Sequence, residues 1–226
     1  MTFTYEEKAS SCPYVDVVWR TEDQTDGVYV AAADASWDMV FIRDMEGKAK
    51  VLLSGPCSNI TFVPYVAGNR NFGIRFKPGT IFTRIPVTGM VNVTKALPMP
   101  TEDAFVLQGI TRKLPTYENI DEFLARLTEE GLLSIDSVVN DLLEGRVVNM
   151  SVRSIQRHFG MTIGLSPRRV QQIVSARKAV GLLLQGVPLA DVSYQVGYAD
   201  LPHMIRMLKR FTGYTPLENK QRGEQV

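Results

Sequence analysis

The last third of the chain contains two short segments, about fifty residues apart, that each predict a turn followed by an amphipathic helix. In the second segment, residues 189–196 have helical apolar spacing, and Gly197 then interrupts the pattern. Glycine lacks a Cβ and can adopt the positive φ of a tight reversal. Asp200 can cap a further helix, which ends near Gly213 and Pro216. Two short helices joined by a turn of this kind have the geometry of a helix-turn-helix.

The helix after Asp200 separates apolar from basic residues. Helical spacing predicts an inward stripe of Met204, Met207, Leu208 and Phe211. The residues on or beside the outward side are His203, Arg206, Lys209 and Arg210. A basic outward side suits a DNA groove, because it places cations near phosphates.

The earlier segment, residues 151–160, has the same organisation. Its predicted apolar stripe consists of Val152, Ile155 and Phe159, and the opposite side carries Arg153, Gln156 and Arg157. Arginine reads guanine and glutamine reads adenine through paired hydrogen bonds, so this side suits readout of base edges. A solvated amphipathic helix is the alternative interpretation of either segment taken alone.

Charge is divided unevenly along the chain. Residues 146–226 contain 12 Lys and Arg against 4 Asp and Glu, whereas residues 1–145 contain 13 against 20. The protein is thus an acidic part joined to a basic part. This asymmetry indicates nucleic acid as the partner of the basic part and makes binding salt-dependent.

Six stretches of the basic part keep a definite order and spacing: residues 151–159 (Ser-Val-Arg-Ser-Ile-Gln-Arg-His-Phe), 164–167, 177–184, 197–203, 208–210 and 213–216 (Gly-Tyr-Thr-Pro). Together they resemble the DNA-binding domain of AraC-type (AraC/XylS) bacterial transcription regulators. In that family, a long helix joins two helix-turn-helix units, whose recognition helices can enter successive major grooves. Carried onto this chain, the joining helix runs from Pro167 to about Leu184. It would be about 27 Å long, compared with roughly 34 Å for one turn of DNA.

Particular residues are expected to contact DNA. In the first unit, base readout is expected from Arg153, Gln156 and Arg157. In the second unit, the resemblance places four residues at base-reading positions, which are Leu201, Pro202, His203 and Arg206. Phosphate contacts are expected from Ser151, Arg168, Arg169, Lys209 and Arg210. Leucine and proline offer no side-chain hydrogen bonds, so the second unit is expected to use its His and Arg, methyl contacts and DNA shape.

The first unit departs from the family pattern. Only residues 145–150 separate Ser151 from the preceding helical stretch, residues 135–143. We therefore expect this unit to be abbreviated or loosely held. If its geometry is kept, it should carry more base specificity than the second unit.

Residues 10–95 predict strands. Short β-branched and aromatic runs occur at residues 14–19, 27–31, 39–42, 49–53, 60–63, 72–76 and 91–94. This segment resembles the cupin-like sensor domain that precedes many AraC-type DNA-binding domains, in residues 37–41 and 73–79. The expected class is α+β, with a strand-rich barrel or sandwich in residues 1–98, a helical connector in residues 99–145 and an all-α double helix-turn-helix domain in residues 146–226.

The strand-rich domain either binds a small-molecule effector or serves only for dimerisation. Candidate effector contacts are Trp19, Trp37, Phe41 and Arg75, with the arginine suited to an anionic group. Metal-dependent cupins use several histidines, but both histidines, His158 and His203, lie in the basic part. We expect no metal, no cofactor and no enzyme, because no pairing of a nucleophile with a base is visible.

The expected function is that of a sequence-specific DNA-binding transcription regulator. Its partners would be double-stranded promoter DNA, RNA polymerase, an effector and a second copy of the chain. The resemblance suggests an activator, although the residues leave the sign of regulation open. The alternative is a ligand-binding protein whose degenerate helix-turn-helix domain contacts a protein partner. No apolar run of membrane-spanning length and no signal-peptide pattern occur, so we expect a cytoplasmic protein.

Overall fold

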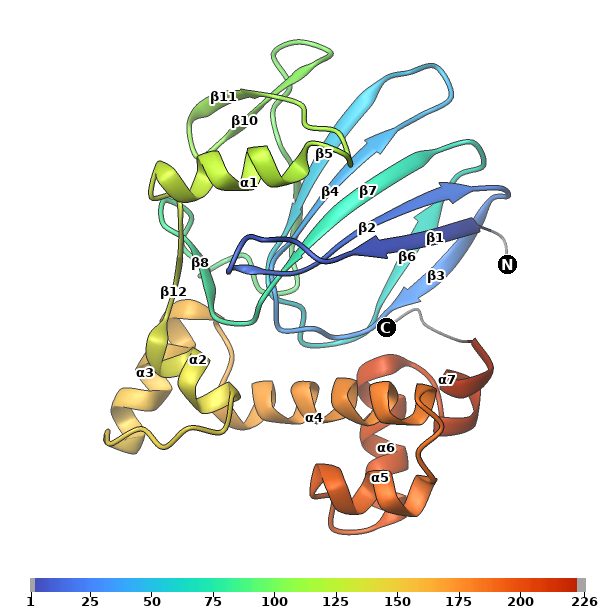
Figure 1. Cartoon of the computed structure of the whole chain (residues 1–226), viewed down its shortest axis with the longest axis vertical. Helices are drawn as coiled ribbons and strands as arrows, with labels where there is room; N and C mark the ends of the chain where they lie inside the picture. Colours follow the sequence, from blue (N-terminus) through green and yellow to red (C-terminus); the bar gives the residue numbers. More distant parts are fainter. Residues whose placement is uncertain (1–2, 223–226) are drawn as a thin grey trace.

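The computed structural model describes residues 3–222, in which a strand-rich part lies against an all-α part (Figure 1). The strands are β1 (Phe3–Lys8), β2 (Val15–Asp23), β3 (Gly27–Ala31), β4 (Asp38–Arg43), β5 (Ala49–Ser54), β6 (Thr61–Tyr65), β7 (Arg70–Phe76), β8 (Thr80–Phe82), β9 (Thr94–Ala96), β10 (Ala104–Leu107), β11 (Ile110–Lys113) and β12 (Leu133–Ile135). The helices are α1 (Ile120–Glu129), α2 (Ser137–Leu143), α3 (Val152–Thr162), α4 (Pro167–Leu184), α5 (Leu189–Val196), α6 (Leu201–Thr212) and α7 (Pro216–Arg222). The expected α+β class is confirmed.

The largest sheet has six antiparallel strands in the order β1-β2-β7-β4-β5-β9. Strands β3 and β6 form a separate two-stranded ribbon. Phe3 of β1 contacts Tyr29 and Tyr65 of that ribbon, with ring centroids 6.3 and 5.5 Å away. Alternating residues of β4 and β5 are buried, because successive side chains of a strand point to opposite faces. Among the described residues, the sheet does not close on itself.

Two segments differ from the predicted secondary structure. Residues 91–94 form a turn in which Asn92 has a φ of 59°, and only Thr94 belongs to β9. Within the predicted helical connector, β10 and β11 form a hairpin. Its two turn residues, Gln108 and Gly109, have φ values of 54° and 81°, as in the primed turns that join twisted strands. A Gln-Gly pair is a weaker signal of this turn than Asn-Gly or Asp-Gly, which explains why the hairpin was not predicted.

The connecting helices join different hydrophobic cores. Helix α1 buries Ile120, Phe123, Leu124 and Leu127 in the core of the strand-rich part, as their spacing predicted. Helix α2 instead buries Val139 in the core of the helices. Helix α1 therefore packs on the strand-rich part, whereas α2 packs on the other helices. The domain limits at residues 98 and 145 remain predictions.

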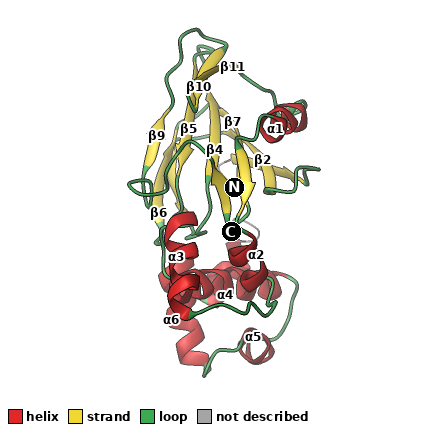
Figure 2. Ribbon diagram, turned by 90° about the vertical axis from the view of Figure 1, so that its left-hand side faces the viewer, coloured by secondary structure: helices red, strands yellow, loops and turns green. Residues whose placement is uncertain are grey.

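Helix α4 is the rod of the all-α part. It spans the residues expected for the joining helix and buries six side chains, which are Val170, Ile173, Ala176, Ala179, Val180 and Leu183. Helices α3 and α6 lie on one side of α4, and α2 and α5 lie on the other (Figure 2). None of the helices within residues 3–222 is both long and apolar enough to cross a bilayer.

The two parts of the molecule are joined by specific contacts. Ala33 and Ala35, between β3 and β4, are buried in the helical core. The backbone N–H of Ala33 donates to the carbonyl of Phe211 on α6, at 2.8 Å. At the end of α6, a Cβ on Gly213 would lie 2.8 Å from the Val30 side chain. The strand-rich part thus touches the end of the second predicted recognition helix directly.

Candidate nucleic-acid interface

The second unit has the turn that the sequence predicted. Helix α5 ends at Gly197, whose φ is 82°, and Asp200 begins the next helix by accepting a hydrogen bond from the N–H of His203 at 2.6 Å. Pro202 lies in the first turn of α6, where its missing N–H removes no helical hydrogen bond. The glycine turn and the aspartate cap thus join α5 to α6 through residues 197–200.

The two sides of α6 are segregated as expected. Met204, Leu208 and Phe211 are buried, and Met207 is half-buried. The exposed residues are Leu201, Pro202, Arg206, Lys209 and Arg210. His203 is half-buried, because its ring makes an edge contact with Tyr198 at 5.5 Å between centroids. The predicted base-reading residues of the second unit therefore lie along one end of α6, with His203 the least accessible.

In the first unit, Ser151 caps α3 by accepting a hydrogen bond from the N–H of Ser154. Phe159 is buried and Ile155 packs against the same core. Val152 does not belong to this stripe, since it is 72% exposed. It is the first residue of the helix and lies beyond the buried turns. The predicted base-reading residues, Arg153, Gln156 and Arg157, are all exposed on the outward side.

The first unit is not abbreviated, because α2 provides its supporting helix. Asp136 caps α2 by accepting from the N–H of Val139. Its second carboxylate oxygen pairs with Nδ1 of His158 at 2.7 Å and accepts from the hydroxyl of Thr162 at 3.0 Å. Burial raises the pKa of Asp136, but hydrogen bonds from His158, Val139 and Thr162 outweigh burial and hold that pKa below its usual value. One carboxylate thus ties the start of α2 to two residues, one turn apart, in the C-terminal half of α3.

Only one of the two roles of Asp136 can be predicted from the sequence. An Asp before an apolar run is a typical helix start, so the capping role of Asp136 was accessible from the pattern. Its pairing with His158, 22 residues later, was not, because no local periodicity relates the two.

The expected phosphate contacts fall into two groups. Ser151, Arg168, Lys209 and Arg210 are exposed. Arg169 points instead to the strand-rich part, where its guanidinium donates to the carbonyl of Ser58 at 2.7 Å and to Oδ1 of Asn59 at 2.8 Å. It also lies 4.5 Å from the centroid of the Phe211 ring. A phosphate contact by Arg169 stays a prediction, and in this arrangement it would require these bonds to break.

Replacing Arg169 with alanine is expected to loosen the contact between the two parts. The loss of its charge-assisted hydrogen bonds should lower the free energy of unfolding by about 1–3 kcal/mol. Arg168→Ala is the matched control, because Arg168 is exposed and adjacent. Thermal unfolding of both variants, measured beside DNA affinity, separates the roles. A uniform loss of DNA affinity by Arg169→Ala at unchanged stability would instead favour the phosphate contact.

The four candidate effector residues do not meet in one site. Phe41 is buried and stacks on Phe72 with centroids 4.6 Å apart. Trp19 is half-buried and covers Gly73, where a Cβ would lie 2.3 Å from its ring. Both aromatics therefore serve packing in this structure, and their effector roles stay predictions.

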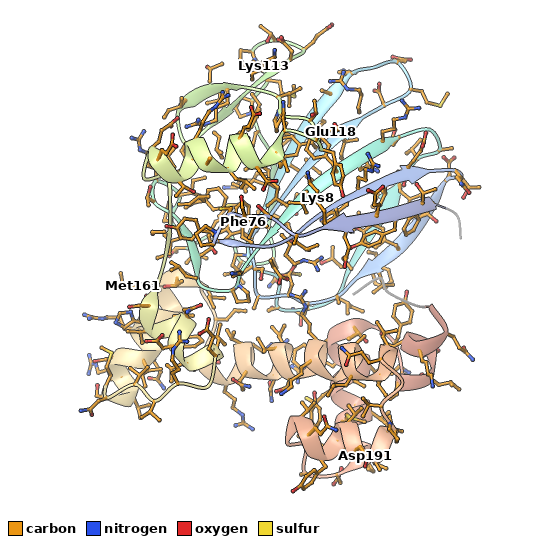
Figure 3. All side chains as sticks on the ribbon, viewed as in Figure 1. Lys8, Phe76, Lys113, Glu118, Met161 and Asp191 are labelled. Carbon is orange, nitrogen blue, oxygen red and sulfur yellow. The ribbon has the colours of Figure 1, made fainter. Side chains whose placement is uncertain are left out.

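Trp37 and Arg75 line different cavities. Trp37 borders a half-open cavity of about 250 Å³, formed by residues 81–87 and by Met161 and Thr162 at the end of α3. Figure 3 shows Met161 at the end of α3 nearest the strand-rich part. Arg75 borders a smaller cavity of about 50 Å³ together with Arg177 of α4. Both cavities lie where the two parts of the molecule meet.

A group of charged residues surrounds Arg75. Its Nε lies 3.5 Å from Asp38 and 3.9 Å from Asp34, and Arg177 lies 3.4 Å from Asp16. Burial and the neighbouring Asp34 raise the pKa of Asp38 well above its usual value, despite the opposing charge of Arg75. Burial and the charge of Arg75 lower the pKa of Arg177. These coupled charges connect the main sheet with the joining helix.

Within residues 3–222, no three His, Cys, Asp or Glu side chains are arranged to hold a metal ion. Both cysteines are free thiols. Cys12 is buried, and Cys57 is half-buried beside the carbonyl of Asn59.

The arrangement of α2 to α6 defines a class of protein domain. Two helix-turn-helix units are joined by one long helix and present their exposed basic helices on the same side of it. Residues 145–222 match a family model described as "Helix-turn-helix domain". This C-terminal part is an AraC-type helix-turn-helix domain, as its motifs predicted. The match begins after α2, so the supporting helix of the first unit lies outside it.

No curated protein matches the chain. Similar solved structures include ToxT from Vibrio cholerae O395, which is 11% identical with a TM-score of 0.47 and covers 100% of this chain and 99% of its own. ToxT bound to (E)-4-(8-methylnaphthalen-1-yl)but-3-enoic acid is 10% identical, with a TM-score of 0.48 and coverage of 98% and 99%. Unsaturated fatty acid bound ToxT from strain SCE256 is 11% identical, with a TM-score of 0.42 and coverage of 89% and 96%.

Proposed function

We propose that this chain is a sequence-specific DNA-binding transcription regulator. The observation that carries the proposal is the pairing of two supported helix-turn-helix units on one rod. Helices α3 and α6 lie on the same side of α4 (Figure 2), and their exposed residues include Arg153, Gln156, Arg157 and Arg206. These side chains have the donors and acceptors that read guanine and adenine in the major groove.

The strand-rich part is proposed to modulate DNA binding. It contacts α6 through the Ala33–Phe211 hydrogen bond and α4 through Arg169 and Arg177. A small molecule that favoured one arrangement of these contacts would change the placement of the recognition helices, because coupling requires two arrangements with different ligand affinity. Contact with RNA polymerase and pairing with a second copy belong to the same proposal.

A protein that acts through a protein partner is the second candidate. It is favoured by Leu201 and Pro202, which are exposed at the start of α6 and offer no side-chain hydrogen bond to a base. Under that hypothesis the chain would retain the fold of the DNA-binding domain without sequence-specific binding.

Selection of bound duplexes from a random DNA pool distinguishes these candidates. The full-length protein, at near-physiological salt, is expected to enrich two sequence blocks spaced by about one helical turn. Affinity for the selected site should fall steeply with salt, because counterions are released from neutralised phosphates. If no sequence is enriched, with or without extracts that contain effector molecules, the proposed function is wrong and the protein-partner hypothesis is favoured.

A further inference from the structure

Gly160 occupies an unusual position in the first recognition helix. It lies inside α3, four residues after Gln156, three after Arg157 and seven after Arg153. These spacings place all four residues on one helical side. Gly160 is exposed, like the three predicted base-reading residues. The outward side of α3 therefore has a gap one turn beyond its glutamine and arginines.

Nothing within the described part of the protein requires glycine at this position. A Cβ on Gly160 would meet no atom within 4 Å, and its φ is not positive. Glycine also weakens a helix interior relative to alanine, because it loses more backbone entropy on folding. Gly164, four residues later, is a useful contrast: its φ is 75°, and a Cβ there would lie 2.4 Å from Val91. The fold explains Gly164 but not Gly160.

We infer that Gly160 is the point at which the sugar-phosphate backbone of DNA approaches α3 most closely. This inference rests on the proposed function. The major groove is about 12 Å wide and a helix with side chains is roughly 10–12 Å across, so the groove walls confine the helix. Base contacts come from the first turns of a recognition helix. Gly160 lies in the last turns of α3, where the helix leaves the bases and passes a groove wall.

The missing side chain sets the depth of insertion of α3. A wall that touches the helix backbone at Gly160 allows Gln156 and Arg157 to reach base edges. A methyl group at residue 160 would hold the helix away from the wall and lengthen several contacts at once. Since the wall is the same for every sequence, the methyl group should weaken binding without changing which bases are preferred.

The test compares Gly160→Ala with Gly181→Ala. Gly181 is the matched control, because it lies within helix α4 and its Cβ would also meet no atom within 4 Å. Both variants should melt about 1–4 °C higher than the wild type, as expected for replacing glycine in a helix interior. Only Gly160→Ala should lose affinity for the DNA selected by the wild type, by about tenfold, with the base preference kept.

Each outcome bears on the inference. A Gly160→Ala protein that binds within about twofold of the wild type overturns it and leaves the proposed function intact. Binding that weakens together with a lowered melting temperature also overturns it, because the fold would then require the glycine. A changed base preference would show contact with a base edge rather than with the backbone. If the wild type selects no DNA, the proposed function itself fails, and the inference fails with it.

Discussion

Replacing Arg153 with alanine is expected to weaken binding to the selected DNA by about 5- to 150-fold, which corresponds to 1–3 kcal/mol for a lost base contact. Arg153 is exposed on the outward side of α3, opposite the buried Phe159. The loss should be confined to sites that carry the cognate base. At that base pair, the variant should accept the alternatives almost equally. Competition binding with single-base variants of the selected site measures both effects.

The control for Arg153 is a predicted phosphate contact in the same domain. Lys209 is exposed near the end of α6, and Lys209→Ala should weaken binding to all sequences by a similar factor and reduce its salt dependence. A uniform loss from Arg153→Ala, with unchanged base preference, would assign Arg153 to the phosphates. Melting curves exclude a folding defect, because neither side chain contributes to the hydrophobic core.

Replacing Asp136 with alanine is expected to lower the free energy of unfolding by about 2–3 kcal/mol. Loss of a helix cap costs about 1 kcal/mol, and unpaired polar groups at buried and half-buried positions add about 1–2 kcal/mol. His158 and Thr162 would lose their common acceptor, and α2 would no longer be fixed against α3. DNA affinity should fall together with stability, since the first recognition helix would lose its support. Denaturant unfolding and binding to the selected site are the measurements.

The pH dependence of Asp136 has a definite sign. Its hydrogen bonds hold the pKa of the folded-state carboxyl below its usual value. The carboxylate therefore stabilises the fold at pH values above the unfolded pKa, and this contribution is lost as the pH falls through the folded value. Asp136→Asn keeps a helix cap but removes the charge, so it should lose this acid-side dependence. Asp141→Ala is the control on the same helix, because Asp141 forms only exposed pairs with Arg146.

If Asp136→Ala left both stability and DNA binding unchanged, α2 would not support the first unit. A loss of stability at unchanged DNA affinity would show that α3 keeps its position without α2. Either result would show that DNA binding by the first recognition helix does not depend on the Asp136 contacts between α2 and α3.

Local sequence patterns predicted the features that depend on residues close together in the chain. Apolar spacing gave the buried side of α6, because one side of a surface helix must face the core, whereas the limits of α4 were implied by the resemblance to AraC-type domains. Gly197 and Asp200 gave the turn of the second unit, because backbone conformation and capping depend on adjacent residues. The same reasoning placed most strands of the main sheet. It failed for Val152, whose exposure depends on how far the core extends beneath the helix.

Local sequence patterns did not predict the contacts between residues far apart in the chain. Arg169 was expected to contact phosphate, yet it bonds Ser58 and Asn59, more than a hundred residues earlier in the chain. Trp37 and Arg75 were expected in one effector site, yet they border separate cavities at the junction of the two parts. No pattern within a helix or strand specifies which distant surface a long cationic side chain will meet.

The sequence by itself determined two turn-and-helix segments, a strand-rich partner and the basic outward residues of α3 and α6. These follow from periodicity, caps and composition, which act over a few residues. The joining of the two segments into one AraC-type domain was implied by resemblance to that family. Only the tertiary structure decided that α2 supports the first unit through Asp136, and that the strand-rich part contacts α4 and α6. Those contacts join residues far apart in the chain, and their formation depends on packing two cores against each other.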